Sequence, residues 1–159
     1  MTFRIDEYAP NDFEALHALD QTCYPAGISY SRRTLKWFLA LPGAGCLVAK
    51  SAENPTEVLG FIIAEHEGAE GHIITLDVAE SSRRSGVGTA LLREMEQRLA
   101  ACGVSRVELE TATTNEAGVA FWRHHGYRTH GVIPRYYLGR LDAYAMSKKL
   151  APIGGPGTQ

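Results

Sequence analysis

The stretch Arg83–Leu92, RRSGVGTALL, follows a strand-like run of residues and opens a strongly patterned helix. Gly86 and Gly88 let the backbone approach a ligand closely. The unpaired N–H groups at a helix start and the positive end of the helix dipole point toward an anion, and Arg83 and Arg84 add positive charge there. The stretch therefore predicts a phosphate-binding turn between a strand and a helix.

The helix that follows this turn has one apolar face and ends before Gly103. Its apolar residues recur at three- and four-residue spacing, and they are Val87, Ala90, Leu91, Met95, Leu99 and Cys102. Two common phosphate-binding motifs do not fit. There is no G-x-x-x-x-G-K-[ST] sequence, and Leu91 occupies the third glycine position of a dinucleotide-binding turn. A strand-to-helix connection that binds nothing is the alternative.

The composition is that of an ordinary globular protein. The 159 residues are 45% hydrophobic and 21% charged, which suits one domain over residues 1–150, followed by a disordered Gly- and Pro-rich tail over 151–159. A net charge of −2 argues against a nucleic-acid or membrane partner, because such proteins usually need a broad basic face. We expect a cytoplasmic location, since the sequence shows neither a signal-type start nor a membrane-spanning run.

Strand and helix patterns alternate along the rest of the chain, which predicts an α/β (α+β) fold. The expected strands are 3–8, 46–51, 58–67, 72–78, 106–111, 127–136 and 144–149. The expected helices are 11–23, capped by Asn11, then 32–41, which Ser31 could cap, 87–102 and 116–125.

The turn at Arg83–Gly88 also matches R/Q-x-x-G-x-G/A, the acetyl-CoA pyrophosphate loop of the GNAT family of N-acetyltransferases. The chain resembles this family over nearly its whole length. Gly71–Val78 resembles the family's fourth strand, Leu109–Glu110 with Asn115 its fifth strand and following loop, and Phe121–Tyr127 the end of its fourth helix. The stretch from Tyr136-Tyr137 to Met146 resembles protein N-terminal acetyltransferases, including the bacterial ribosomal-protein-alanine type.

This resemblance implies a GNAT fold: a mixed, mostly antiparallel seven-stranded sheet flanked by about four helices. The fourth and fifth strands would splay apart and admit the pantetheine arm of acetyl-CoA, which binds the backbone, so side chains at 76–78 would matter little. The residues it assigns to acetyl-CoA are Leu76, Asp77, Val78, Arg83, Arg84, Ser85, Gly86, Val87, Gly88, Thr89, Asn115 and Trp122.

Direct attack of an amine on the thioester needs a group that takes up the amine proton. Glu110 is the leading candidate, because it occupies the strand position where these acetyltransferases use a glutamate or histidine. Side chains alternate along a strand, so Glu108 lies on the same face as Glu110, and Val107 and Leu109 lie on the opposite face. The alternative is a solvated residue or an ion-pair partner.

His72 is the second candidate, because archaeal and eukaryotic N-terminal acetyltransferases carry a catalytic or water-positioning histidine or tyrosine at this place. Its reference pKa near 6.5 suits a proton relay at neutral pH. A structural or surface histidine is the alternative, and spacing alone does not tell whether His72 and Glu110 converge.

Trp122 departs from the bacterial ribosomal-protein enzymes, which carry a tyrosine thought to protonate the leaving thiolate. An indole can donate a hydrogen bond but cannot act as an acid near pH 7. Three interpretations of Trp122 remain: the thiolate receives its proton by another route, the acceptor pocket differs, or the tryptophan packs the helix against the cofactor.

The resemblance places the walls of a peptide-end channel at Tyr24, Tyr30, Tyr136 and Tyr137. Their hydroxyls can hold a peptide backbone while the rings pack its first side chain, and ordinary core or surface tyrosines are the alternative. The basic stretch of His124, His125, Arg128, His130 and Arg135 reads as a solvated helix end and strand edge, and its spacing does not suit a metal. Three widely spaced cysteines favour reduced, mostly buried thiols.

The sequence thus predicts an acetyl-CoA-dependent N-acetyltransferase without a metal, acting on the α-amine of a protein or peptide as a monomer or homodimer. One alternative is an acetyltransferase of the same fold whose acceptor is a small amine such as a polyamine, aminoglycoside or amino acid. A second is a non-catalytic acyl-CoA-binding sensor module, a reading that Trp122 supports.

Overall fold

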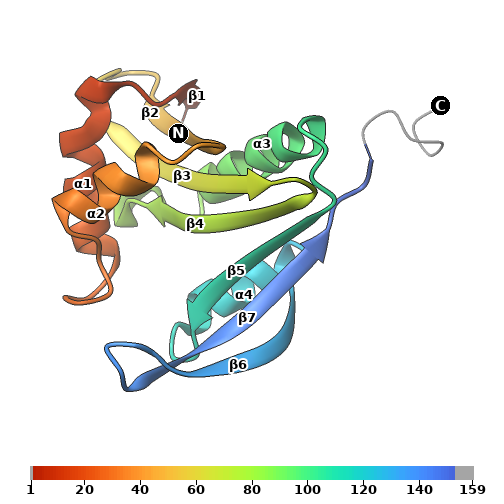
Figure 1. Cartoon of the computed structure of the whole chain (residues 1–159). Coiled ribbons are helices and arrows are strands. Elements are labelled where there is room, and N and C mark those ends of the chain that lie inside the picture. The colour runs from red at the N-terminus through yellow and green to blue at the C-terminus, as the bar shows by residue number, and fades with distance from the viewer. Residues whose placement is uncertain (1, 153–159) are drawn as a thin grey trace.

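The structure is a computed structural model that describes residues 2–152. These residues form a seven-stranded sheet in the order β1-β2-β3-β4-β5-β7-β6, in which β4 and β5 are parallel and all other neighbours are antiparallel (Figure 1). The strands are β1 (Phe3–Glu7), β2 (Ala44–Ser51), β3 (Val58–Glu67), β4 (Glu70–Val78), β5 (Arg106–Ala112), β6 (Arg128–Tyr137) and β7 (Leu141–Lys149). The predicted sheet is confirmed.

Four α-helices, with two 3-10 turns, connect these strands in the described range. They are α1 (Phe13–Cys23), α2 (Arg32–Leu39), α3 (Val87–Ala101) and α4 (Glu116–His124), and the 3-10 turns are η1 (Pro10–Asp12) and η2 (Glu80–Ser82). None of the helices in residues 2–152 is long and apolar enough to cross a membrane.

Local signals explain most helix boundaries. The predicted Ser31 cap is present, because its hydroxyl accepts a hydrogen bond from the Thr34 N–H at 3.1 Å. Gly103 ends α3 with φ +89°, a conformation that favours glycine. The predicted Asn11 cap is wrong, because Asn11 lies inside η1 and α1 begins only at Phe13. The Asp12 carboxylate instead accepts the Ala9 N–H at 2.9 Å, which bends the chain before the helix.

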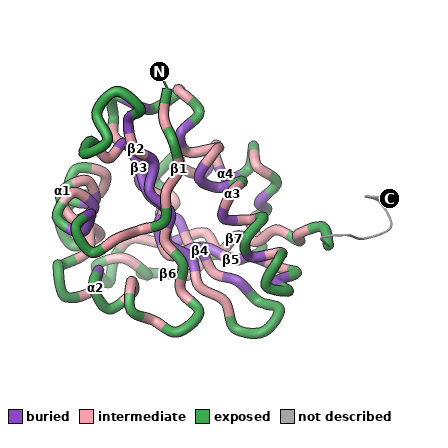
Figure 2. The backbone as a smooth tube through the Cα atoms, turned by 90° about the horizontal axis from the view of Figure 1, so that it is seen from above, coloured by how far each residue is buried: buried purple, intermediate pink, exposed green. Residues whose placement is uncertain are grey.

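Two hydrophobic clusters cover the two faces of the sheet. One lies between the sheet and α3, and includes Leu91, Met95 and Leu109; the other lies under α1 and α2 and includes Leu16 and Leu35. Figure 2 shows the buried positions along the central strands and along one side of the covering helices. The sheet is therefore covered on both faces, and two of its neighbouring strands separate at one end.

That separation lies between β4 and β5, as predicted. The two strands pair only through Glu70–His72 and Arg106–Glu108, and beyond His72 they diverge (Figure 1). A bulge lies just beyond the last pair with β5, because the register with β3 passes from Ile73 to Thr75 and leaves Ile74 without a partner. Such a bulge bends the strand and redirects its backbone groups.

Two of the sequence-based predictions concern the chain as a whole. The prediction of one domain over residues 1–150 stays a prediction. Of the predicted disordered tail, 151–159, residues 153–159 lie outside the described residues, and Ala151 and Pro152 belong to no helix or strand.

Candidate active site

His72 and Glu110 converge at the point where β4 and β5 part. The Nε2 atom of His72 lies 2.7 Å from Oε1 of Glu110. The hydrogen bond to Glu110 raises the pKa of His72 above its ordinary value, burial opposes this shift, and the negative charges of Glu110, Glu65 and Glu108 reinforce it. The two candidate proton-transfer groups therefore form one unit, a contact that the sequence left open.

Glu110 is further held by the last residues of β6. The hydroxyl of Tyr136 lies 3.4 Å from Oε1 of Glu110, and that of Tyr137 lies 3.4 Å from its main-chain oxygen. Burial first and Glu110 second raise the pKa of Tyr136. Glu108 does not join this group, because its carboxylate pairs with Arg106 at 3.0 Å. The two glutamates lie on one strand face, as alternation predicts, but only Glu110 bonds His72.

Two further tyrosines reach the other wall of the cleft. Tyr24 and Tyr30 lie in the α1–α2 loop, residues 24–31. The Tyr24 hydroxyl donates to the Leu76 carbonyl at 3.1 Å, and the Tyr30 hydroxyl donates to the Ile74 carbonyl at 3.4 Å. All four predicted tyrosines therefore line the splay, one pair bound to each of the two strands.

The backbone of β4 offers alternate groups to the cleft. Ala79 donates to the Leu59 carbonyl, so by the alternation of an antiparallel ladder Asp77 bonds β3, while Leu76 and Val78 face away from it. Of the three residues predicted to bind the cofactor through their backbone, only Leu76 and Val78 therefore have N–H and C=O groups that are not paired with β3. The side chain of Asp77 is 1% exposed and accepts a hydrogen bond from Thr75, so it belongs to the interior. That the side chains at 76–78 matter little to the cofactor stays a prediction.

The loop between β4 and α3 has the features of an anion-binding turn. Arg84 and Gly86 have positive φ values of 66° and 89°, and no side chain caps the first N–H groups of α3. A Cβ on Gly88 would lie 3.3 Å from the Phe121 ring, so a larger residue would crowd the helix start. The exposed Arg84 side chain and the uncapped N–H groups of Val87, Gly88 and Thr89 fit a pyrophosphate.

A model of the acetyltransferase (GNAT) family matches residues 13–127. The chain belongs to this family. It is 35% identical over 108 residues to an uncharacterized N-acetyltransferase of Methanocaldococcus jannaschii, an alignment that covers 66% of this chain and 68% of the relative. It is 30% identical over 112 residues to an N-alpha-acetyltransferase of Sulfurisphaera tokodaii, covering 62% and 67% of the two chains.

Solved structures agree with this assignment. Ard1 from Thermoplasma volcanium superposes with a TM-score of 0.84 at 26% identity and covers 95% of this chain and 99% of its own. The ribosomal-protein-S18-alanine N-acetyltransferase from Escherichia coli superposes with a TM-score of 0.82 at 21% identity, covering 94% and 95%, which shows a shared fold. This GNAT chain is therefore an acyltransferase, and its family uses acetyl-CoA.

The remaining predicted cofactor residues have structural roles of their own. Arg83 is turned back, and its Nε donates to the Val78 carbonyl at 3.3 Å. The Ser85 hydroxyl bonds the Ser82 carbonyl within the loop. Asn115 caps α4, since its Oδ1 accepts the Gly118 N–H at 3.0 Å. Both arginines of this turn are exposed, but Arg83 is engaged with the Val78 carbonyl, whereas no hydrogen bond to the Arg84 side chain is found among the described residues.

Trp122 lies in the hydrophobic core of the GNAT domain. It is 9% exposed, and its ring packs at 5.4 Å from that of Tyr127. The tryptophan thus packs α4 against the core, and its predicted contact with the cofactor stays a prediction. The histidines of the predicted basic stretch have different partners. His125 lies 3.1 Å from the Thr89 hydroxyl at the start of α3, and His130 lies 3.8 Å from the Glu108 carboxylate on β5.

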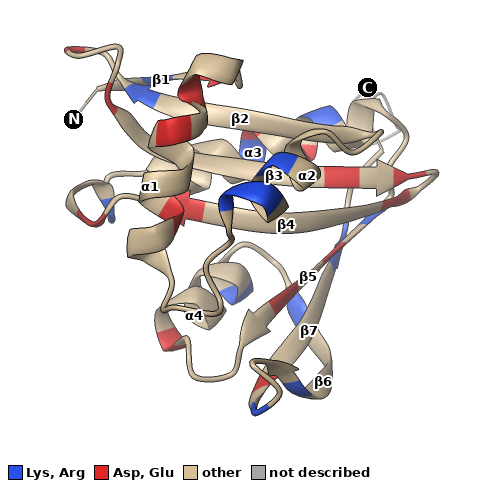
Figure 3. Ribbon diagram, turned by 60° about the vertical axis from the view of Figure 1, so that its left-hand side comes forward, with Lys and Arg blue, Asp and Glu red and all other residues tan. Residues whose placement is uncertain are grey.

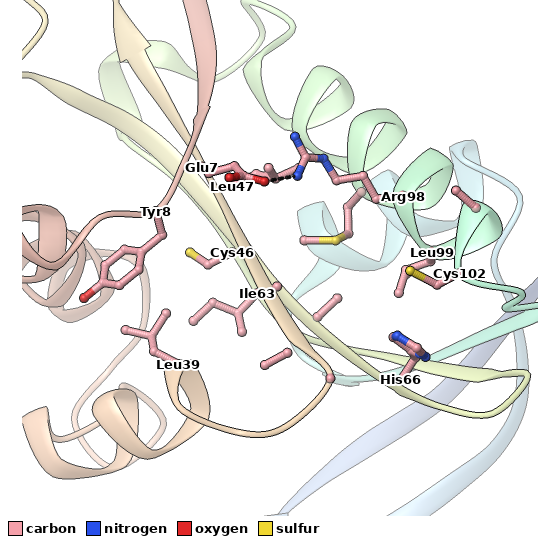
Figure 4. A pocket seen from close by; sticks show the side chains of 16 residues that line it. Glu7, Tyr8, Leu39, Cys46, Leu47, Ile63, His66, Arg98, Leu99 and Cys102 are labelled. Carbon is pink, nitrogen blue, oxygen red and sulfur yellow. Dashed lines mark hydrogen bonds and ion pairs between the residues drawn. The ribbon is translucent and has the colours of Figure 1, made fainter.

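Groups of three or more metal-binding side chains do not occur within residues 2–152. The cysteines are free, as predicted, but Cys102 is exposed, contrary to the expectation of mostly buried thiols. Cys46 and Cys102 line a cavity of about 650 Å³ between the start of β2, the end of β3 and α3, and none of the predicted site residues lines it (Figure 4).

Sequence reasoning missed Asp20, which is completely buried at the end of α1 and faces Asp77. One signal could have found it. Phe13, Leu16 and Asp20 follow helical spacing, which places an acidic residue on the buried stripe of the helix. A carboxyl group at such a position calls for a specific partner.

Proposed function

We propose that this GNAT enzyme transfers acetyl from acetyl-CoA to the N-terminal α-amine of a protein or peptide. The observation that carries the proposal is the 2.7 Å contact between His72 Nε2 and Glu110 Oε1 at the opening of the β4–β5 splay. The relationship to an N-alpha-acetyltransferase at 30% identity supports the choice of acceptor.

The proposed reaction is a direct attack. The lone pair of the neutral amine forms a bond to the thioester carbonyl carbon, the carbon–sulfur bond breaks, and the sulfur leaves as thiolate and then takes a proton. Glu110, acting with His72, receives the proton that the attacking nitrogen loses. An α-amine has a reference pKa near 8 and is about one-tenth neutral at pH 7, so a modest base suffices.

Acetyl-CoA would lie across the splay. Its pantetheine arm would bond the backbone of Leu76 and Val78, and its pyrophosphate would bind the uncapped start of α3 beside Arg84. The carbonyls of both strand residues already accept bonds from side chains, namely Tyr24 and Arg83. The N–H groups of the same two residues, which also face away from β3, are thus the donors we assign to the cofactor.

The acceptor would enter between the α1–α2 loop and the end of the β6–β7 hairpin. These two segments touch, because Leu138 Cδ2 lies 2.2 Å from where a Cβ on Gly27 would stand. The hydroxyls of Tyr30, Tyr136 and Tyr137, which belong to the same two segments, are directed at β4 and β5. An entrance beside this contact would suit an extended chain end.

The test measures CoA release from acetyl-CoA with a panel of peptides that differ in their first two residues. Each peptide is paired with an otherwise identical one whose N-terminus is blocked and which carries an internal lysine. We expect release only with free N-termini. A comparable rate with polyamines or amino acids would assign the enzyme to small amines, and a rate unaffected by blocking the N-terminus would refute the proposal.

A further inference from the structure

Two carboxyl groups face each other in the interior, on the α1 side of β4. Asp20 is 0% exposed and Asp77 is 1% exposed. Figure 3 shows acidic residues on both elements. Asp20 Oδ1 and Asp77 Oδ2 have no hydrogen-bond donor among the described residues. If one of these two oxygens carries a proton, the two side chains can form a hydrogen bond with each other.

The other oxygen of each group is used. Asp20 Oδ2 accepts the main-chain N–H of Tyr30 at 2.6 Å, and Asp77 Oδ1 accepts the Thr75 hydroxyl at 2.5 Å. Two buried negative charges in contact would repel, and the desolvation of each would be costly. A single shared proton removes one charge and satisfies both orphaned oxygens.

No cation faces the pair from the described elements packed against it. Cys23 and Tyr24 at the end of α1, Tyr30 in the α1–α2 loop and Cys46 of β2 are the titratable groups around it, and burial raises the pKa of each. Phe61 of β3 lies opposite Asp77. Arg83 donates to the Val78 carbonyl at 3.3 Å and approaches the Cys23 sulfur at 4.0 Å, but it forms no ion pair with Asp20 or Asp77. The surroundings thus favour one neutral member of the pair.

The pair connects α1 and the α1–α2 loop to the strand that forms the cleft. Asp20 holds the backbone of Tyr30, whose hydroxyl bonds the Ile74 carbonyl on β4. Asp77 belongs to the same strand, three residues along. The loop is therefore tied to β4 twice, once through the tyrosine hydroxyl and once through the two carboxyl groups.

We propose that Asp20 and Asp77 are positioning residues that share one proton, and that this proton holds the α1–α2 loop in the arrangement that receives the acceptor amine. The acceptor part of this inference rests on the proposed function, in which the loop forms one wall of the acceptor entrance. Loss of the proton at alkaline pH separates α1 from β4, shifts Tyr30 and weakens acceptor binding.

Asp77→Asn is the decisive variant. An asparagine side chain donates to Asp20 Oδ1 and accepts from Thr75, so it preserves both bonds without a proton to lose. Asp77→Ala removes them and leaves the Asp20 charge buried and unpaired. The matched control is Asp6→Asn, which removes a partly exposed carboxylate on β1 that pairs with Arg4.

Two readouts need no acceptor. The infrared carbonyl band of a protonated carboxylic acid should be present near pH 7 in the wild type and in Asp6→Asn, and absent in Asp77→Asn. Hydrogen exchange of the Tyr30 amide, which donates to Asp20, should be protected equally in the wild type and Asp77→Asn at about pH 7, and accelerated about tenfold or more in Asp77→Ala. Absence of the band in the wild type overturns the shared proton.

A third readout uses whichever amine is the best acceptor. Titration of an α-amine by itself lowers acceptor KM as pH rises, because more of the amine is neutral. We expect wild-type acceptor KM to rise instead at alkaline pH, and that of Asp77→Asn to keep falling, while the Kd for acetyl-CoA stays similar in both. Identical profiles would overturn the positioning role.

The outcomes separate this inference from the proposed function. If Asp77→Ala fails to fold, Asp77→Asn and the wild type still give the band and the KM profiles. If no peptide reacts, the proposed acceptor is refuted, while the band and the Tyr30 exchange still decide the proton and the attachment of the loop.

Discussion

His72 Nε2 lies 2.7 Å from Glu110 Oε1, and this contact spans the two strands at the place where their backbone pairing ends. A side-chain hydrogen bond thus links the two strands just where their backbone hydrogen bonds end. It also fixes the imidazole and the carboxylate relative to each other before any substrate arrives, so the proton-accepting unit is preorganised.

Glu110→Gln should lower kcat by about two orders of magnitude or more, because it removes the proton acceptor that we assign to the reaction. The Kd for acetyl-CoA, measured by calorimetry, should stay within about twofold, since the carboxylate lies away from the pyrophosphate turn. Glu108→Gln is the matched control on the same strand, and its turnover should stay near that of the wild type. Near-normal turnover in Glu110→Gln would refute the assignment.

The pKa of His72 should exceed its ordinary value of about 6.5, because the hydrogen bond and charge of Glu110 stabilise the protonated ring. Protonated His72 cannot accept a proton, so kcat/KM should rise with pH through this raised pKa. An NMR titration of the ring checks the value, and Glu110→Gln should lower it. An unchanged pH profile of kcat/KM in His72→Ala would exclude a relay through this residue.

Tyr137→Ala should raise the KM for a peptide about tenfold while the KM for acetyl-CoA changes little, because the Tyr137 hydroxyl bonds the main-chain oxygen of Glu110 and we assign its ring to the acceptor entrance. Tyr137→Phe separates the two contributions, since it keeps the ring and removes only the hydroxyl. Steady-state kinetics with each substrate varied in turn measures both effects. Equal increases in the two KM values would indicate a folding role instead.

Gly27→Ala should disturb the entrance to the cleft. A Cβ there would collide with Leu138 Cδ2, and the φ of +90° at this residue favours glycine. We expect a loss of about 1–2 kcal/mol in the free energy of unfolding from the backbone alone, together with an increased acceptor KM. Adding Leu138→Ala should restore the acceptor KM, because it removes the collision. It should not restore the free energy of unfolding that alanine loses at a positive φ. A double variant no better than the single one would mean that the two segments do not meet in solution.

Asp77→Asn should change the pH dependence of stability. Burial and the hydrogen bond with Asp20 raise the pKa of Asp77 well above its ordinary value of 3.8. The folded wild type therefore holds a proton that the unfolded chain releases, so its stability is greatest below this ordinary value and falls as pH rises toward the folded-state pKa.

The variant lacks this proton, so its advantage over the wild type should grow from about pH 5 to about pH 8 in urea unfolding. Groups common to both proteins cancel in the difference. Parallel stability curves for the wild type and the variant would contradict the shared proton.

The local elements were largely predictable because their signals are local. The strand 58–67 has the predicted bounds, and helix 87–102 differs by a single residue, since hydrophobic periodicity and the glycines at its ends specify both boundaries. The start of α1 was mispredicted because Asn11 and Asp12 are both acceptable caps by residue type, and only the hydrogen bond from Ala9 to Asp12 selects the turn.

The sequence by itself determined the order of the elements, the pyrophosphate-type turn at Arg83–Gly88 and the residue types of the cleft, because these depend on contacts between near neighbours in the chain. The tertiary structure decided which of them meet. His72 reaches Glu110 across 38 residues, and Asp20 on α1 reaches Asp77 on β4, only when the sheet and the helices that cover it have packed and set the directions of these side chains. Those directions follow from long-range packing, which no local pattern encodes.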